Sequence, residues 1–170
     1  MRLAATAFLI ATAGWIVVAG QTPGDQKLQN NLKNLFPAAA SFSPKEGSPP
    51  HITAFNPAKA PVGFAFWTTD LEPLERGYDG PIKILVGMDP KGLLTGVVVA
   101  EHHEPYGSFS VDTPEFAGQF KNKSIRDPFK VGGDIDAVSR ATISITSASR
   151  AVRNSARRVA RQLLTPEAVK

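Results

Sequence analysis

The fold is decided by a stretch in the middle of the chain, PIKILVGMDPKGLLTGVVVAE, residues 81–101. Two runs rich in β-branched residues flank the tetrapeptide DPKG. Asp89 at the first position, Pro90 at the second and Gly92 at the fourth suit a type I turn, because the proline ring fixes the φ that the second position needs. The stretch therefore predicts an antiparallel hairpin.

The segments before the hairpin predict a further strand and a helix. Residues 62–69, VGFAFWTT, are aromatic and β-branched enough for a strand. Residues 25–36, DQKLQNNLKNLF, place their leucines on one helical face, with Asp25 positioned as the cap. Residues 37–51, PAAASFSPKEGSPPH, are rich in proline and serine, which predicts a loop.

Two helices are predicted after the hairpin. The first begins at Thr113, with Pro114 at its first helical position. The second is long and amphipathic. Its apolar positions recur every three or four residues from Ile143 and are Ile145, Ala148, Val152, Ala156, Val159 and Leu163. The arginines on its opposite side are Arg150, Arg153, Arg157 and Arg161.

These elements predict an α+β fold. We expect a small antiparallel sheet with the hairpin at its centre, flanked by the N-terminal helix and the long C-terminal amphipathic helix. The arginine side of that helix is interpreted as a solvated face, and docking on an acidic partner or a membrane surface is the alternative.

The composition of the chain excludes several classes of function. A chain of 170 residues suits one domain with its own core. The net charge of +4 is modest and no nucleic-acid motif is present, so nucleic-acid binding is not expected. The absence of cysteine excludes disulfides, thiolate metal sites and thiol catalysis.

The N-terminus has the order of a secretory signal peptide. Arg2 precedes an apolar run over residues 3–19, and Val18-Ala19-Gly20 offers small residues for cleavage. As a helix the run is about 25 Å long, against a hydrocarbon core of about 30 Å. We therefore expect export to the periplasm, with an uncleaved membrane anchor as the alternative.

The loop that follows the hairpin carries two adjacent histidines. His102 and His103 at a strand end point to opposite faces, so they are poorly placed to bind one metal ion. We expect this loop, which continues through Glu104 and Tyr106, to contact a ligand instead. The chain has no nucleophile elbow, phosphate loop or outstanding carboxylate pair, which leaves hydrolase and NTPase activities unsupported.

The stretch DAVSRATIS, residues 136–144, leads into the long helix. A helix N-terminus has unpaired N–H groups and a partial positive charge, which attract phosphate, and Arg140 adds a full charge. Ser139 and Thr142 can donate hydrogen bonds or accept a covalent bond. Simple capping by Ser139, Thr142 or Ser144 is the alternative.

Residues 77–105 together with residues 136–144 resemble the FMN-binding domain family. That family occurs in the periplasmic flavoprotein subunits of Rnf and sodium-pumping NADH:quinone reductase complexes, and in NosR-type membrane regulators. The hairpin and the EHHEP loop are most similar to the NosR-type branch. The resemblance covers roughly residues 62–164 and implies an electron carrier without turnover of its own.

The family motif Asp-x-x-Ser/Thr-Gly-Ala-Thr marks the site where a flavin transferase attaches FMN as a phosphoester. Asp136, Ser139, Ala141 and Thr142 match this motif, so the resemblance implies Thr142 as the acceptor. Arg140 stands where glycine is usual, and its side chain either hinders the transferase or helps hold the phosphate.

The resemblance also implies where the flavin ring lies. His103, Glu104 and Tyr106 are the expected contacts from the loop. The predicted strand is the expected opposite wall through Phe64, Phe66 and Trp67, with core packing of these aromatics as the alternative. The rival function is a sensory or assembly module in which FMN is absent or structural.

Partners and domain limits complete the expectations. The implied partners are the flavin transferase and a membrane or periplasmic redox protein. The N-terminus is a further route to the membrane. The expected divisions are a signal peptide or anchor over 1–20, a helix and loop over 21–61, the FMN-binding domain over 62–165 and a tail over 166–170.

Overall fold

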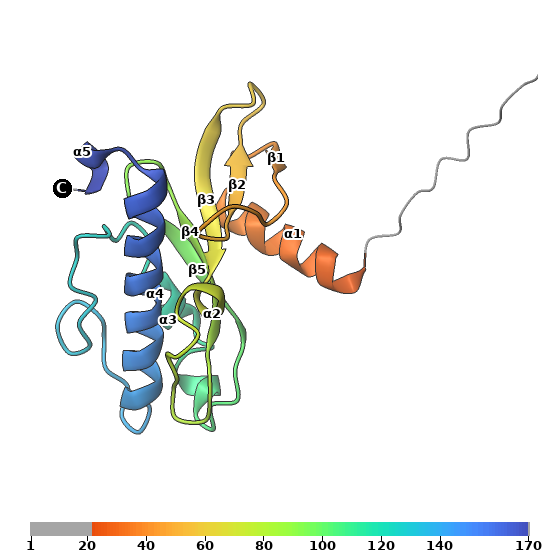
Figure 1. Cartoon of the computed structure of the whole chain (residues 1–170). Coiled ribbons are helices and arrows are strands. Elements are labelled where there is room, and N and C mark those ends of the chain that lie inside the picture. The colour runs from red at the N-terminus through yellow and green to blue at the C-terminus, as the bar shows by residue number, and fades with distance from the viewer. Residues whose placement is uncertain (1–21, 170) are drawn as a thin grey trace, which may run out of the picture.

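One antiparallel sheet of five strands organises the chain, in the order β1-β2-β3-β4-β5 (Figure 1). The structure is a computed structural model that describes residues 22–169, so the predicted signal peptide lies outside the described residues. The strands are β1 (Ser41–Phe42), β2 (Ile52–Phe55), β3 (Pro61–Trp67), β4 (Lys83–Met88) and β5 (Leu94–Glu101). The predicted α+β class is confirmed.

The predicted hairpin is formed by β4 and β5, but it lies at one side of the sheet and not at its centre. The other strands all add on the β4 side. The outer edge of β5 is covered at its beginning by the chain itself: Leu94 receives a hydrogen bond from Asn122 N–H and donates one to Lys123 O, both 2.8 Å. This cover leaves no room for another strand at that point.

The predicted loop over residues 37–51 contains the short strand β1, and β2 follows it directly. Both belong to the same sheet as β3, so residues 21–61 do not form a separate helix-and-loop region. The predicted strand over 62–69 ends at Trp67. Thr68 begins the short helix α2 (Thr68–Leu71), and its buried hydroxyl accepts a hydrogen bond from Ile84 N–H at 3.0 Å.

Helices cover both faces of the sheet (Figure 1). The long helix α4 (Thr142–Leu163) packs on one face and α1 (Pro23–Leu35) on the other. Alternation along β4 explains this, since Ile84 and Val86 join the core under α4 while Leu85 joins the core under α1. Gly63 allows Phe36 to lie against β3, because a Cβ there would collide with the ring.

The helix starts follow the sequence with one correction. Thr22, not Asp25, caps α1, and Asp25 completes a capping box from the third helical position. Thr113 caps α3 (Pro114–Gly118) as predicted. The predicted tail contains a short helix, α5 (Pro166–Val169). Within residues 22–169 no helix is both long and apolar enough to span a membrane.

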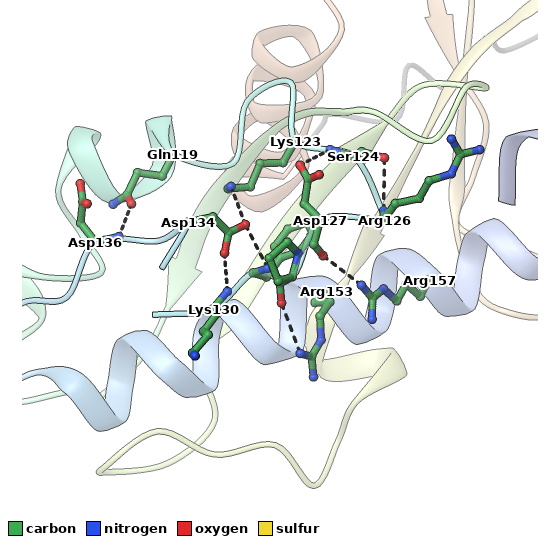
Figure 2. Close-up of polar contacts among 12 residues, drawn as sticks. Gln119, Lys123, Ser124, Arg126, Asp127, Lys130, Asp134, Asp136, Arg153 and Arg157 are labelled. Carbon is green, nitrogen blue, oxygen red and sulfur yellow. Dashed lines mark hydrogen bonds and ion pairs between the residues drawn. The ribbon is translucent and has the colours of Figure 1, made fainter. Parts of the chain in front are cut away.

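The apolar side of α4 is buried as predicted, but its arginine side is not a simple solvated face. Arg157 donates to Ile125 O at 2.7 Å. It also donates to Asp127 O at 2.9 Å, and Arg153 donates to Pro128 O at 3.4 Å (Figure 2). Burial lowers the pKa of Arg157, and the neighbouring Arg153 and Arg161 lower it further. These side chains hold the loop before α4 against the helix.

Candidate functional site

A tight turn leads the chain into α4. Ala141 N–H donates to Val138 O at 3.1 Å, which closes a four-residue turn, and Arg140 at its third position has φ +69°. A type II turn requires a positive φ at this position, which glycine adopts without strain. This backbone conformation gives a physical reason why glycine is usual in the family motif where this chain has Arg140.

The first turn of α4 has no side-chain cap. Its N-cap is Ala141, so simple capping by Ser139, Thr142 or Ser144, the alternative weighed for this stretch, does not occur. Thr142 is the first helical residue and is exposed. Among residues 22–169 its hydroxyl makes one hydrogen bond, a long one of 3.5 Å to Val138 O. The hydroxyl is therefore accessible at the positive end of a helix of 22 residues.

A cavity of about 290 Å³ opens beside this turn. The residues that line it are Tyr78, Pro105, Tyr106, Arg140, Thr142, Ile143 and Ser144. Three of the predicted site residues, Tyr106, Arg140 and Thr142, meet here. The sequence interpretation missed Tyr78 and Ile143, which are 70% and 59% exposed. A signal for Tyr78 existed, because an aromatic residue in the turn-like sequence RGYDG is poorly placed for core packing.

Glu104 lies behind the wall of the cavity. Its side chain is buried, with the residue 6% exposed. Oε2 accepts a hydrogen bond from Tyr78 N–H and Oε1 accepts one from Asp79 N–H, each at 3.0 Å. Ser144 Oγ donates a further, short hydrogen bond to Oε2. Glu104 thus joins two segments of the cavity wall that are distant in the sequence.

The remaining predicted residues lie around the cavity and not in its lining. His103 is exposed, and Asp136 and Ser139 are exposed in the loop before the turn. His102 Nδ1 accepts from Glu104 N–H at 3.0 Å, and its Nε2 lies 2.8 Å from Asp112 Oδ1. These bonds order the backbone of the loop.

The aromatic strand does not form the opposite wall. Phe66 is 1% exposed in the core beneath α4, and Trp67 packs in the second core beneath α1. Core packing, the alternative weighed for these aromatics, is therefore correct. The aromatic residues that line the cavity are instead Tyr78 and Tyr106.

The loop that presents the motif is held in place along its length (Figure 2). Lys123 Nζ lies 2.8 Å from Asp134 Oδ2, and Asp134 also accepts hydrogen bonds from Phe129 and Lys130 N–H. Burial alone would raise the pKa of Asp134, but these hydrogen bonds together lower it below its ordinary value. Asp136 N–H donates to Gln119 Oε1 at 2.6 Å.

The groups that line the cavity suit a ligand with an anionic group and a flat ring. It offers a hydroxyl, an uncapped helix start, one guanidinium and two tyrosines. The part of the chain that the structure describes contains no cluster of three or more His, Asp or Glu residues that could hold a metal ion. Nothing in the lining has the geometry of a general acid–base pair.

The sequence around the cavity matches a known protein family. Residues 77–157 match the family model of the FMN-binding domain. The match covers just under half of the chain. The match includes the Tyr78 segment, the EHHEP loop and the start of α4, so it contains every wall of the cavity. The resemblance expected from the sequence is confirmed, and the closer likeness to the NosR-type branch stays a prediction.

Curated relatives provide a second comparison. The chain is 32% identical over 126 residues to a subunit of the ion-translocating oxidoreductase complex of Methanosarcina acetivorans, covering 66% of this chain and 64% of that protein. It is 38% identical over 103 residues to the corresponding subunit of the Haemophilus influenzae complex, covering 55% and 48%. The chain thus spans about half to just under two thirds of the length of these relatives.

A solved structure gives a weaker likeness. The crystal structure of Shewanella oneidensis NqrC aligns with a TM-score of 0.45 at 20% identity, covering 79% of this chain and 82% of that chain. A likeness at this level carries no argument about the site.

The residues that line the cavity have the chemical groups that FMN binding needs. Small-molecule pockets span roughly 300–1,000 Å³, so a cavity of about 290 Å³ suits the ring system better than the whole cofactor. Tyr78 and Tyr106 offer aromatic surface to a ring, and the helix start with Arg140 offers positive charge to a phosphate.

Proposed function

We propose that this domain carries FMN on Thr142 through a phosphoester and passes electrons between redox partners outside the cytoplasm. When bound, FMN supplies the redox chemistry, and the protein supplies attachment, orientation and electrostatics. The observation that carries the proposal is the exposed Thr142 hydroxyl at the mouth of the cavity. The lining offers no separate substrate site, so we interpret the domain as a carrier.

The attachment chemistry requires an accessible hydroxyl. Thr142 Oγ1 would attack the flavin-side phosphorus of FAD, the bond from that phosphorus to the bridging oxygen would break, and AMP would leave. The hydroxyl proton would pass to a base of the flavin transferase. Because Thr142 makes only one weak hydrogen bond, little stabilising interaction is lost when its oxygen reacts.

The product is a phosphodiester with one negative charge. The N–H groups of the first turn of α4 are not capped by a side chain and can face this charge. Arg140 lines the same cavity and adds a full positive charge. Asp136 stands clear of this cluster with an exposed side chain, a suitable contact for a transferase.

Location and partners follow from the N-terminal pattern and from the relatives. Arg2, the apolar run over 3–19 and the small residues before Gln21 support export to the periplasm, with or without a retained anchor. The relatives are named as subunits of ion-translocating oxidoreductase complexes. A membrane redox complex is therefore the proposed class of electron partner.

The test is co-expression of the full chain with and without a flavin transferase, followed by intact-mass measurement and flavin fluorescence in a denaturing gel. Thr142→Ala should abolish covalent flavin and leave the fold intact. Alanine removes no cap here and is a better helix former than threonine by about 0.5 kcal/mol. Thr142→Ser keeps the nucleophile and should retain some attachment.

Thr146→Ala is the matched control, because Thr146 is an exposed threonine one turn further along α4. It should load as wild type does. A fluorescent band from the Thr142→Ala protein would assign the attachment to another residue. Wild-type protein that stays unmodified beside a competent transferase would refute covalent attachment.

A further inference from the structure

The buried carboxylate of Glu104 is a feature that the attachment chemistry does not use. The cavity lining does not include Glu104, and both of its oxygens face donors of the protein. The ion pairs found among residues 22–169 do not include it either. Burying a carboxylate without a paired cation is unfavourable unless hydrogen bonds replace the lost water.

The three donors come from the two walls of the cavity. Tyr78 and Asp79 belong to the segment between α2 and β4, and Ser144 belongs to the first turn of α4. An ionised carboxylate only accepts hydrogen bonds, which matches three donors arranged around two oxygens. Glu104 therefore fixes Tyr78 relative to the helix turn that starts with Thr142.

Two neighbouring features support this role. Gly77 precedes the bonded segment, and a Cβ there would collide with the Glu104 carboxylate, so glycine is required for the close approach. Further along, Arg150 forms a bidentate pair with Glu75, with both nitrogen–oxygen distances 2.7 Å. The segment that contains Tyr78 is thus joined to α4 twice, by the hydrogen bonds of Glu104 and by the Arg150–Glu75 pair. The connection through Glu104 is buried and adjoins the cavity.

We propose that Glu104 is a positioning residue for the flavin: it sets the separation between the Tyr78 wall and the Thr142 hydroxyl, and so fixes the ring beside its point of attachment. This inference rests on the proposed attachment of FMN to Thr142. Glu104 would act through the protein and not by direct contact with FMN, because both of its carboxylate oxygens already accept hydrogen bonds from the protein.

The first measurement uses the flavin-free full chain. Glu104→Gln replaces one acceptor oxygen by an NH₂ group, which cannot accept from Tyr78 or Asp79 N–H. Amide hydrogen exchange of at least one of these two residues should become roughly tenfold faster. Glu101→Gln is the matched control, since Glu101 is an exposed glutamate three residues earlier, and it should leave both amides unchanged.

The second measurement uses chain co-expressed with the transferase. Glu104→Gln should carry severalfold less covalent FMN by intact mass, and the attached flavin should show a changed visible circular dichroism spectrum. Ser144→Ala removes one donor and leaves both N–H bonds, so it should change the spectrum less. If Glu104→Gln does not fold, Ser144→Ala alone carries the test.

The outcomes separate the two proposals. Loaded wild type, together with a Glu104→Gln protein whose exchange, loading and spectrum are unchanged, would overturn the positioning role and leave the attachment standing. Wild type that is never loaded would overturn the attachment, and the positioning role with it. A spectral change in the Glu101→Gln control equal to that in Glu104→Gln would also count against a specific role for Glu104.

Discussion

Replacing Arg140 by glycine should stabilise the domain. Arg140 has φ +69° at the third position of the turn before α4, and a left-handed backbone costs a non-glycine residue about 1–2 kcal/mol. Glycine loses more freedom on folding, which offsets about 0.5–1 kcal/mol. The exposed Arg140 side chain makes no hydrogen bond or ion pair among the described residues, so nothing else is lost. The expected net gain is about 0.5–1 kcal/mol.

The assay is thermal unfolding of flavin-free protein, checked by urea unfolding. For a protein of this size, 1 kcal/mol corresponds to about 2–4 °C in Tm, so Arg140→Gly should raise Tm by about 1–4 °C. Lys59→Gly is the matched control. Lys59 is also exposed, has φ 59° and lies in the turn between β2 and β3, far from the cavity in the sequence and the sheet. It should gain a similar amount.

A lower Tm for Arg140→Gly, with the expected rise for Lys59→Gly, would refute this reasoning. It would show that the guanidinium makes a contact worth more than the backbone strain. Covalent loading is the second readout. Glycine is the residue of the family motif, so loading should at least equal that of wild type, and poorer retention of flavin would show that Arg140 pairs with the phosphate.

Two further predictions concern the loop that presents the motif. Asp134→Asn should destabilise the domain near neutral pH, because the Asp134 carboxylate accepts hydrogen bonds from Lys123, Phe129 and Lys130. The pKa of Asp134 in the folded protein lies below the ordinary 3.8, so the carboxylate stabilises the fold above pH 3.8 and this stabilisation is lost as the pH falls through the folded pKa. In urea unfolding, the difference in free energy of unfolding between variant and wild type should therefore be smaller below pH 3.8 than at pH 7. Arg157→Lys should cost about 1–2 kcal/mol in urea unfolding, since lysine cannot donate to both Ile125 O and Asp127 O. Arg161→Lys, at an exposed position on the same helix, should cost nothing measurable.

Local patterns predicted the elements whose stability is largely local. The DPKG turn, the Thr113 cap and the apolar spacing of α4 depend on residues within a few positions of one another, and the structure has all three. The strands β1 and β2 were missed because they are short and lie in or beside a segment rich in proline and serine. Their strand conformation depends on pairing with one another and with β3, which a local pattern does not contain.

The arginine side of α4 shows a second limit of local reasoning. Helical periodicity separated the arginines correctly from the buried side. It could not show that residues 125–128 fold back over the helix and present their carbonyl oxygens to Arg153 and Arg157. The same limit applies to the site, since Tyr78 reaches the cavity through a tertiary contact with Glu104.

The motif interpretation named Thr142 and Arg140, the loop interpretation named Tyr106, and all three line the cavity. The physical basis of the motif still needed the structure. Sequence reasoning treated Arg140 as a question of bulk and charge. The turn adds a backbone reason, because the third position has a positive φ whatever the side chain does.

The shape of the cavity and the proposed tether support one another. A cavity of about 290 Å³, open enough to leave Tyr78 and Ile143 largely exposed, can bury only part of FMN. Even a micromolar complex, worth about 8 kcal/mol, dissociates and must rebind. At the proposed location outside the cytoplasm, little free FMN is expected for rebinding. With a covalent bond at Thr142 the cavity no longer has to retain the flavin; it has only to orient the ring. That task needs walls at a fixed separation more than it needs a deep pocket, and a buried carboxylate joining both walls meets this need.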